Sequence, residues 1–252
     1  MINLLEINLE KAVEAIIDAK HITAFTGAGI SVESGIPSYR GEGGLWTKYD
    51  TKVLELKYFY NNPKDAWEVI REIFYDYFGK AKPNPAHFAL AELEEKSNLK
   101  AIITQNIDNL HNEAGSKIVF EFHGNSKVML CTKCGKKHKV ENVNLDKLPP
   151  KCSDCKGLLK PNFIFFGEGI PQDAYKNSFA EADKADLFIL IGVTGLVEPA
   201  ARIPRIAKQN GATIIEINPQ RTAYTETITD VFLQGKAGEV MTQLNEMLFE
   251  EL

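Results

Sequence analysis

The sequence has few of the features that mark membrane or secreted proteins. Its longest apolar run, Leu187–Val193, has seven residues and contains a glycine, whereas a transmembrane helix needs about 18. The N-terminal residues 1–6 include no basic stretch and no small-residue cleavage site of the kind that signal peptides carry. We therefore expect a soluble, cytoplasmic protein that has no membrane partner.

Positive charge is also in short supply. Lysine and arginine number 29 against 34 aspartates and glutamates, which gives a net charge of −5 at pH 7. Such a surface does not attract phosphate backbones overall, so nucleic acid is an unlikely partner. The 44% apolar and 25% charged content is ordinary for a globular protein, and 252 residues can form one large domain with an added module.

Cysteine occurs only four times, in two close pairs. Cys131 and Cys134 form one Cys-x2-Cys pair, Cys152 and Cys155 form the other, and seventeen residues separate them. This spacing is typical of a tetrahedral zinc site. Four thiolates would occupy all of its coordination positions, so we expect one structural zinc ion. Disulfides are an alternative, but a chain without an export signal is expected in a reducing compartment. A thioredoxin-like redox pair is a weaker alternative, since neither pair opens a helix in a βαβ pattern. His138 lies between the pairs and is expected at the surface, not as a ligand.

The remaining pattern predicts an α/β protein. A helix is expected over Asn8–Lys20, with Asn8 as its cap and Val13, Ile16 and Ile17 on one face. Asn62-Pro63 and Asn84-Pro85 mark further helix starts. Helical segments separate most of the short apolar runs, which indicates crossovers and a mainly parallel sheet covered on both faces. The runs are Ile22–Thr26, Ala101–Thr104, Ile118–Phe122, Phe163–Phe166, Leu187–Ile191, Thr213–Ile217 and Val231–Leu233.

The predicted architecture is a doubly wound, mainly parallel Rossmann-like sheet with a small inserted zinc-binding module. Residues 1–125 and 161–252 would form the Rossmann-like domain, with a helical insertion at about 40–85. Residues 126–160 would form the module, whose nine lysines and three acidic residues give it a charge of +6. We interpret these lysines as a solvated face, since charge runs usually are; a docking surface for acidic partners is the alternative.

A glycine-rich turn follows the first predicted strand. Gly27 and Gly29 could let the backbone approach a pyrophosphate, and the following helix would present free N–H groups to it. The dehydrogenase fingerprint G-x-G-x-x-G is broken, however, because Val32 occupies the third glycine position. The glycines alone are therefore weak support for a dinucleotide site, and a tight turn explains them nearly as well.

Polar residues gather after several strands. They follow the second strand at residues 104–111, the third at His123-Gly124, and later strands at Gly192-Val193-Thr194 and Asn218-Pro219. Because parallel strands end at the same edge, these side chains are expected where an open α/β sheet binds its ligand.

Taken with the paired cysteines, these motifs resemble the sirtuins, a family of NAD-dependent protein deacylases. The segments that match are Gly27-Ala28-Gly29-Ile30-Ser31, Ser34-Gly35-Ile36-Pro37, Thr104-Gln105-Asn106-Ile107-Asp108, His123-Gly124 and Phe166-Gly167-Glu168. The resemblance spans roughly residues 10 to 240 in the family's order. It implies NAD as co-substrate, an acyl-lysine protein or peptide as substrate, and transfer of the acyl group to ADP-ribose with release of nicotinamide.

The resemblance also implies roles for particular residues. His123 would be the general base and Asn106 would position the ribose and a water. The implied cofactor-binding residues are Gly27, Ala28, Gly29, Val32, Tyr39, Arg40, Gln105, Asn106, Ile107, Asp108, Gly192, Val193, Thr194, Asn218 and Ala237. The implied substrate-binding residues are Ile164, Phe166, Gly167, Glu168, Leu196 and Val197, which would clamp the peptide as an added strand. Strand alternation places Phe163 and Phe165 on one face and Phe166 near the acyl group.

Departures from the family pattern refine these expectations. Tyr39 stands where the family usually has Phe, and Val193 stands where a hydroxyl residue is common, which could weaken NAD binding. A desuccinylase branch carries a Tyr-x-x-Arg pair, and the equivalent positions here are Ile70 and Ile73. An apolar pair cannot neutralise an acyl carboxylate, so we predict deacetylation or removal of other apolar acyl groups.

Other functions remain open at this point. A mono-ADP-ribosyltransferase or an NAD hydrolase would use the same cleavage of nicotinamide from ribose with a different acceptor. A non-catalytic NAD-binding module, or a zinc-ribbon adaptor that binds nucleic acid through the +6 module, would need neither His123 nor Asn106. A dehydrogenase is least expected, because the fingerprint is broken.

Overall fold

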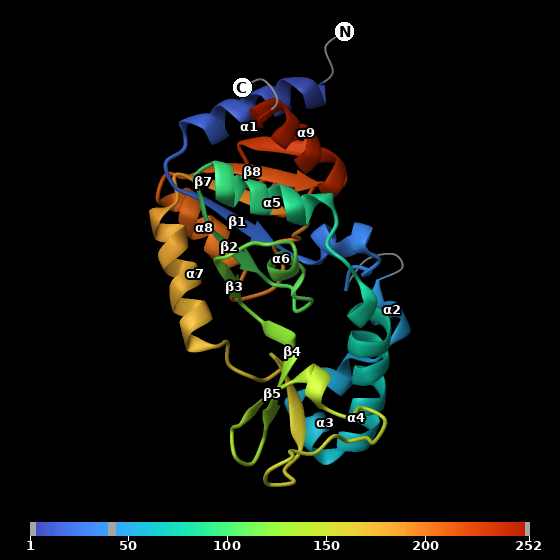
Figure 1. Ribbon diagram of the computed structural model, residues 1–252. Helices are drawn as coiled ribbons and strands as arrows, with labels where there is room; N and C mark the ends of the chain where they lie inside the picture. The colour runs from blue at the N-terminus through green and yellow to red at the C-terminus, as the bar shows by residue number, and fades with distance from the viewer. Residues whose placement is uncertain (1–3, 40–43, 250–252) are drawn as a thin grey trace.

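The computed structural model describes residues 4–39 and 44–249 and shows two lobes, one above the other (Figure 1). The larger lobe contains a parallel sheet and the helices that cover it. The smaller lobe contains a three-stranded antiparallel sheet and several short helices. Helices α1 (Leu4–Asp18) and α9 (Ala237–Phe249), the first and last that are described, contact each other at the far end of the larger lobe.

The six strands of the larger sheet lie in the order β3-β2-β1-β7-β8-β9, and every neighbouring pair is parallel. This confirms the predicted doubly wound α/β fold. The strands are β1 (Ile22–Thr26), β2 (Leu99–Thr104), β3 (Val119–Glu121), β7 (Leu187–Ile191), β8 (Thr213–Asn218) and β9 (Val231–Gln234).

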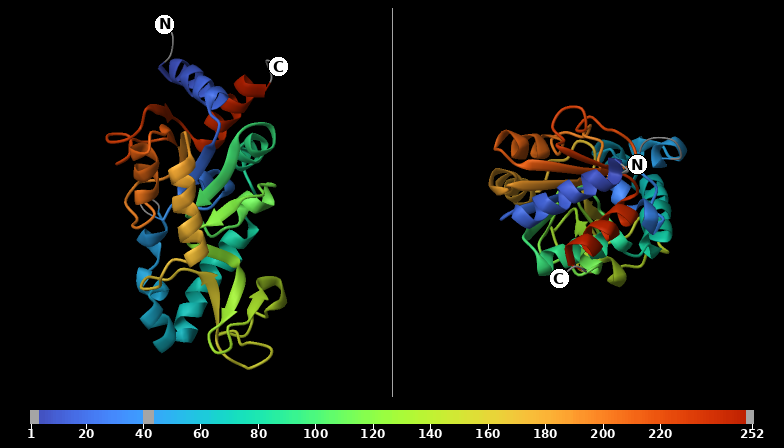
Figure 2. Two further views of the ribbon diagram at one scale, coloured as in Figure 1. Left: turned by 90° about the vertical axis from the view of Figure 1, so that its left-hand side faces the viewer. Right: turned by 90° about the horizontal axis from the view of Figure 1, so that it is seen from above.

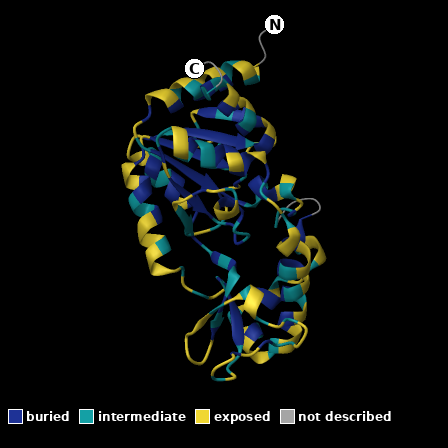
Figure 3. Ribbon diagram, in the orientation of Figure 1, coloured by how far each residue is buried: buried dark blue, intermediate teal, exposed yellow. Residues whose placement is uncertain are grey.

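Helices bury both faces of this sheet (Figure 2). Helices α1, α5 (Pro85–Lys96) and α9 share one core with alternate strand residues such as Ala24 and Ile189. Helices α7 (Gln172–Lys184) and α8 (Arg202–Gln209) share a second core with the intervening residues, such as Phe25 and Leu190. Burial on both faces explains why these strands read as continuous apolar runs, and Figure 3 shows the buried sheet interior.

The first helix differs from its prediction. It begins at Leu4, so Asn8 lies inside it and donates a hydrogen bond to the Phe232 carbonyl oxygen (3.0 Å) instead of capping the helix. The buried face consists of Leu9, Ala12 and Ile16, whereas Ile17 is 67% exposed. Residues three or four positions apart share a helix face. Ile17 is the residue after Ile16 and lies outside the face that Leu9, Ala12 and Ile16 form.

The run Phe163–Phe166 does not form a strand of the parallel sheet, so that prediction is wrong. Strand β6 (Leu159–Phe163) instead pairs antiparallel with β4 (Gly124–Cys131), which also pairs with β5 (Lys137–Lys139). The rings of Phe163 and Phe165 stack 5.3 Å apart in the core of the smaller lobe. An apolar run predicts burial but does not identify the core in which it is buried.

The segment between residues 45 and 80 is helical and packs against the small sheet. It contains α2 (Leu45–Lys48), α3 (Leu56–Asn61), α4 (Pro63–Ile70), a π-helical segment Arg71–Tyr77, and short 3-10 helices at Thr51–Leu54 and Phe78–Lys80. The Trp67 indole is fully buried and donates to the Leu159 carbonyl oxygen at 2.9 Å. These helices and the cysteine module therefore share one hydrophobic core.

Two predicted helix starts are found at the expected places. Asn84 caps α5, since its side chain accepts from the Ala86 N–H at 3.0 Å. Asn62 precedes α4, but its side chain donates to the Tyr58 carbonyl oxygen and caps nothing. Within residues 4–39 and 44–249, no helix is both long and apolar enough to cross a bilayer.

Candidate active site

The centre of the larger sheet is a topological switch point. The chain continues from β1 to β2 and β3 on one side, and β7, β8 and β9 lie on the other. The loops that follow β1 and β7 therefore diverge, and open α/β sheets bind ligands at this position, beyond the carboxyl ends of the strands. We refer to it below as the switch point.

Three glycines bring the two diverging loops into direct backbone contact. The Gly29 N–H donates to the Gly192 carbonyl oxygen at 3.0 Å, and Gly192 has a φ of +62°. A Cβ placed on Gly29 would lie 2.5 Å from the Gly192 Cα, and one on Gly27 would lie 2.8 Å from the Gly192 oxygen. Close packing of the two loops thus requires these glycines, whatever ligand lies above them.

A short 3-10 helix, η1 (Ala28–Ser34), leads away from the switch point. The Asn84 side chain fixes it, because its Nδ2 donates to the Ile30 carbonyl oxygen at 2.7 Å and to Ser34 Oγ at 3.0 Å. Ala28 is half-buried, and Val32, the residue that breaks the fingerprint, is 49% exposed.

A hydrogen-bonded triad of polar side chains crosses the switch point. Asn106, 5% exposed, donates from Nδ2 to the Gly27 carbonyl oxygen (3.2 Å) and to Ser31 Oγ (3.1 Å). Ser31 Oγ in turn donates to Asp108 Oδ2 at 2.7 Å. The predicted residues Asn106 and Asp108 are thus brought together, while Ile107 between them points into the core of the smaller lobe. The linking Ser31 was missed, although it belongs to the quoted glycine motif.

Burial shapes the charge of this triad. It raises the pKa of the Asp108 carboxyl, although hydrogen bonds from the Leu110 N–H and Ser31 oppose the shift. Tyr39 lies near enough that burial, and then the Asp108 charge, raise the pKa of its hydroxyl. The Tyr39 ring packs on Trp46 with 5.3 Å between centroids. Arg40, predicted beside Tyr39, lies outside the described residues.

His123 lies in the turn between β3 and β4. Its Nδ1 is 3.1 Å from the Gln105 carbonyl oxygen, so the tautomer that donates there leaves Nε2 free to accept a proton. Burial lowers the pKa of the imidazole, with the Gln105 contact opposing. The neutral form that a general base needs is therefore the main form at neutral pH.

Buried polar residues support the site from beneath. Thr104 and His111 belong to the polar segment that was expected at this edge, but the sequence assigned neither of them a role. His111 Nε2 lies 2.9 Å from Thr26 Oγ1, which donates to Thr104 Oγ1 at 2.9 Å. Thr104 Oγ1 then accepts from the Asn106 N–H at 3.1 Å. Burial lowers the pKa of His111 far below its ordinary value, so this chain of contacts is uncharged. A histidine in a sequence gives no sign of such burial.

The opposite side of the switch point contains further residues that were predicted to bind the cofactor. Asn218 Nδ2 donates to the Val193 carbonyl oxygen at 2.9 Å, and Thr194 is exposed. The Val193 side chain is only 2% exposed and packs in the core below. This side chain is therefore not available to a ligand. Ala237 is the first residue of α9.

The predicted substrate segment is attached directly to His123. The Ile164 N–H donates to the His123 carbonyl oxygen at 2.9 Å, and the Phe166 N–H donates to the Leu54 carbonyl oxygen at 2.8 Å. Phe166 is 52% exposed while Phe165 is buried, as strand alternation predicts. Leu196, on the loop after β7, is 66% exposed, and Val197 beside it is half-buried.

The four cysteines form one cluster in the smaller lobe. Their Sγ atoms all lie within 4.8 Å of one another, with 3.4 Å from Cys131 to Cys155 and 3.9 Å from Cys134 to Cys152. Zn–S bonds of about 2.3 Å in a tetrahedron require sulfur separations of about 3.8 Å. Backbone N–H groups of the two turns lower the pKa of the Cys131 thiol to about 6 and that of Cys152 as well. The cluster therefore fits a metal ion that thiolates bind.

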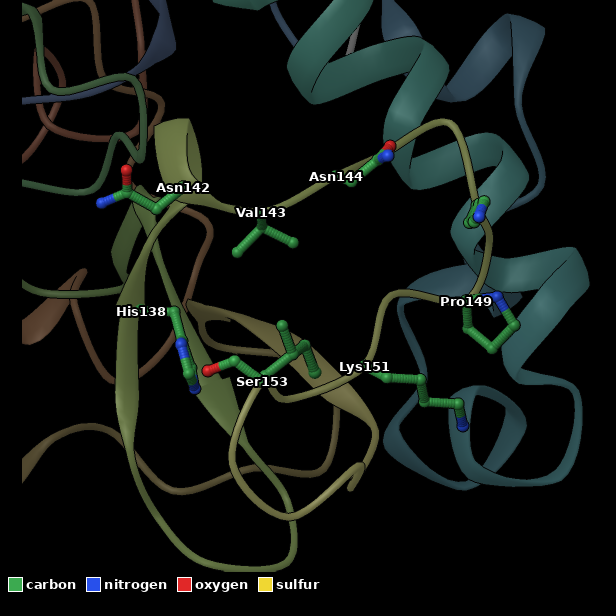
Figure 4. A pocket seen from close by; sticks show the side chains of 9 residues that line it. His138, Asn142, Val143, Asn144, Pro149, Lys151 and Ser153 are labelled. Carbon is green, nitrogen blue, oxygen red and sulfur yellow. The ribbon is translucent and has the colours of Figure 1, made fainter.

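His138 differs from its expected surface position. It is half-buried, and its Nε2 lies 3.3 Å from Cys152 Sγ. It also lines a cavity of about 280 Å³ beside the cysteine cluster, with Val143, Pro149 and Ser153 (Figure 4). A second cavity of about 510 Å³ lies between α5 and the loop before β3. Neither cavity is lined by the residues gathered at the switch point. We place the candidate active site at the switch point because the predicted polar residues meet there, at the edge where open α/β sheets bind ligands.

The fold and the site define an α/β protein with a Rossmann-like sheet and a four-cysteine module, and comparisons identify its family. The Sir2 family profile matches residues 27–199. An NAD-dependent protein deacylase of Pyrococcus abyssi (strain GE5 / Orsay) is 46% identical over 236 residues, which cover 90% of this chain and 92% of the relative.

Solved structures agree. A Sir2 homolog–NAD complex superposes with a TM-score of 0.88 at 42% identity, covering 96% of this chain and 94% of that one. A Sir2–p53 peptide–NAD+ complex has a TM-score of 0.87 at 36% identity, covering 95% and 98%. The chain belongs to the Sir2 family.

Proposed function

We propose that this protein is an NAD-dependent protein-lysine deacylase, which transfers the acyl group from lysine to ADP-ribose and releases nicotinamide. One observation carries the proposal: the segment around Phe166 is hydrogen-bonded to His123, an uncharged base with a free Nε2. The Pyrococcus abyssi relative bears the name of this activity, and the solved relatives hold NAD and a peptide.

The residues at the switch point suit the steps of this reaction. The acyl oxygen would attack C1′ of the nicotinamide ribose, and nicotinamide would leave. His123 Nε2 would then accept the proton of a ribose hydroxyl, which attacks the acyl carbon. Addition of a water to that carbon and cleavage of its bond to nitrogen would release the lysine amine and leave the acyl ester on ADP-ribose. The Asn106–Ser31–Asp108 triad would orient the substrate. The uncharged amide of Asn106 would bind the ribose, and the Asp108 carboxyl would accept a hydrogen bond from the nicotinamide carboxamide. Tyr39 would help to exclude water, which would otherwise capture the cationic intermediate.

The smaller lobe would hold the acyl chain and a structural zinc ion. Ile70 and Ile73 are 0% and 1% exposed in its core, so neither position offers a cation to an acidic acyl group. An apolar acyl group, such as acetyl, is therefore the proposed substrate. Four thiolates would leave zinc no open position, which restricts it to a structural role. Reduced thiols also favour the cytoplasmic location predicted from the sequence.

We retain the predicted domain division as part of this proposal. Residues 1–125 and 161–252 would bind NAD, and residues 126–160 would form the zinc module. A mono-ADP-ribosyltransferase or NAD hydrolase would also bind NAD at the switch point, but neither needs a base for acyl transfer. The free Nε2 of His123 therefore favours deacylation.

Mass spectrometry of an acetyl-lysine peptide, incubated with the protein with and without NAD, tests the proposal. We expect NAD-dependent deacetylation with O-acetyl-ADP-ribose as the second product. The His123→Ala variant should bind NAD yet form no product. NAD consumption with no deacylated peptide would contradict deacylation and favour the transferase or hydrolase.

A further inference from the structure

Lys160 is a lysine in an unusual place. It lies in β6, is 6% exposed, and its Nζ lies 4.2 Å from the centre of the Phe165 ring. The ammonium donates to the carbonyl oxygens of Pro161 (3.0 Å) and Phe163 (2.8 Å) and to Glu168 Oε2 (2.9 Å). All these contacts lie within β6 and the segment that follows it. Lysine is rarely this buried unless it is paired.

Glu168 closes the same segment from its other end. Its Oε2 also accepts from the Phe165 N–H at 2.7 Å, and its own N–H donates to the Phe165 carbonyl oxygen at 2.9 Å. Gly167 completes this turn with a φ of +93°. The carboxylate predicted to contact the substrate is thus turned inward, and Phe166 is held on the outside of the turn that Glu168 closes.

Backbone hydrogen bonds hold the first half of this turn, from Ile164 to His123 and between Phe166 and residues 54–56, whereas the Lys160–Glu168 pair holds its second half. The N–H groups of residues 164, 165, 166 and 168 all have acceptors within the structure. Of residues 164–168, only Gly167 has an N–H with no acceptor in the described part of the chain, so this N–H remains available to a ligand. Burial lowers the pKa of Lys160, and the contact with Glu168 opposes this shift. Loss of one partner would leave the other charge buried and uncompensated.

We propose that Lys160 and Glu168 are positioning residues for the acyl-lysine substrate: their buried ion pair fixes the turn 164–168 so that Phe166 and the Gly167 N–H face the bound peptide. This inference rests on the proposed deacylase function. Within residues 4–39 and 44–249, no hydrogen bond or ion pair joins Lys160 or Glu168 to a predicted NAD-binding residue. The pair therefore acts on the peptide and not on the cofactor.

Steady-state kinetics with Lys160→Met and Glu168→Gln test the proposal. Met retains the apolar stem and Gln retains the shape, so each variant removes mainly a charge. We expect the KM for an acetyl-lysine peptide to rise by about tenfold or more while the KM for NAD stays within about twofold. Lys160→Arg should recover part of the loss. Lys64→Met, which breaks the exposed pair with Glu68, is the matched control and should change neither KM.

Two results would overturn the proposal. One is a folded variant whose peptide KM is unchanged; the other is an equal rise in both KM values, which indicates general damage. Thermal unfolding shows whether each variant is folded. If Lys160→Met does not fold, Glu168→Gln alone tests the proposal.

Hydrogen exchange keeps this inference separate from the proposed function. If the wild-type protein deacylates no peptide, the proposed function fails. Amide exchange then still decides whether the ion pair fixes the turn. We expect both variants to exchange faster at residues 164–168 than the wild type, with unchanged protection in β1 and β7. Unchanged exchange in the turn would refute the positioning role.

Discussion

Substitution of Gly192 by alanine adds only one carbon atom, yet it should destabilise the protein strongly. Gly192 has a φ of +62°, and the left-handed region costs a residue with a Cβ about 1–2 kcal/mol. The new Cβ would also lie 2.5 Å from the Gly29 Cα, where only backbone could move. Overpacking of this kind costs about 1–3 kcal/mol. The expected loss in the free energy of unfolding is therefore roughly 2–5 kcal/mol.

Gly211→Ala provides the control. Gly211 has a φ of +97° and follows α8 on the surface, but a Cβ there would meet nothing within 4 Å. The Gly211→Ala variant should therefore lose only the cost of the positive φ, about 1–2 kcal/mol of the free energy of unfolding. Urea unfolding measures both variants, and titration with ADP-ribose measures the switch point. We expect weaker ADP-ribose binding for Gly192→Ala alone. Equal stability losses in the two variants, with unchanged ADP-ribose affinity, would refute the reasoning.

Three further predictions concern pH, the metal and the acyl group. Because burial lowers the pKa of His123, its imidazole stays neutral until the pH falls below about 6.5; a kcat/KM profile should lose activity only at lower pH, and an acid limb centred above that value would contradict the assignment. Cys131→Ala, or a chelator, should remove folding and activity together, because thiolate-bound zinc contributes an apparent ~10–16 kcal/mol; circular dichroism of a folded but inactive zinc-free protein would show a more direct role for the metal. Succinyl-lysine peptide should be turned over far more slowly than acetyl-lysine peptide, because Ile70 and Ile73 provide no cation; comparable rates in a competition assay would rule this out.

The sheet could be predicted because its strands are buried on both faces. A strand such as Leu187–Ile191 shows a short apolar run, and helical segments between runs require parallel crossovers. The run Phe163–Phe166 carries the same signal, yet it packs in the smaller lobe. Its assignment depends on Trp67 and Phe74, which are distant in sequence and become neighbours only on folding.

The site could be predicted only in part, for a similar reason. Polar residues that follow strands, such as Asn106 and His123, are visible because strand ends share an edge. Ser31 and His111 lie in the quoted motifs, but their roles could not be predicted because these depend on burial and on partners from other strands. Lys160 was counted with a solvated face, since lysine is ordinarily exposed. Because Lys160 is buried, the net charge counted from the sequence does not show which lysines lie on the surface.

The separation of hydrophobic cores has an evolutionary consequence. The sheet and its covering helices form two cores, while the short helices, the cysteine module and the turn around Phe165 share a third. On the proposed function, substitutions in the third core would reshape the space for the acyl chain without repacking the sheet. Selection would then change which modified lysines are recognised while the sheet that supports nucleotide binding is inherited intact.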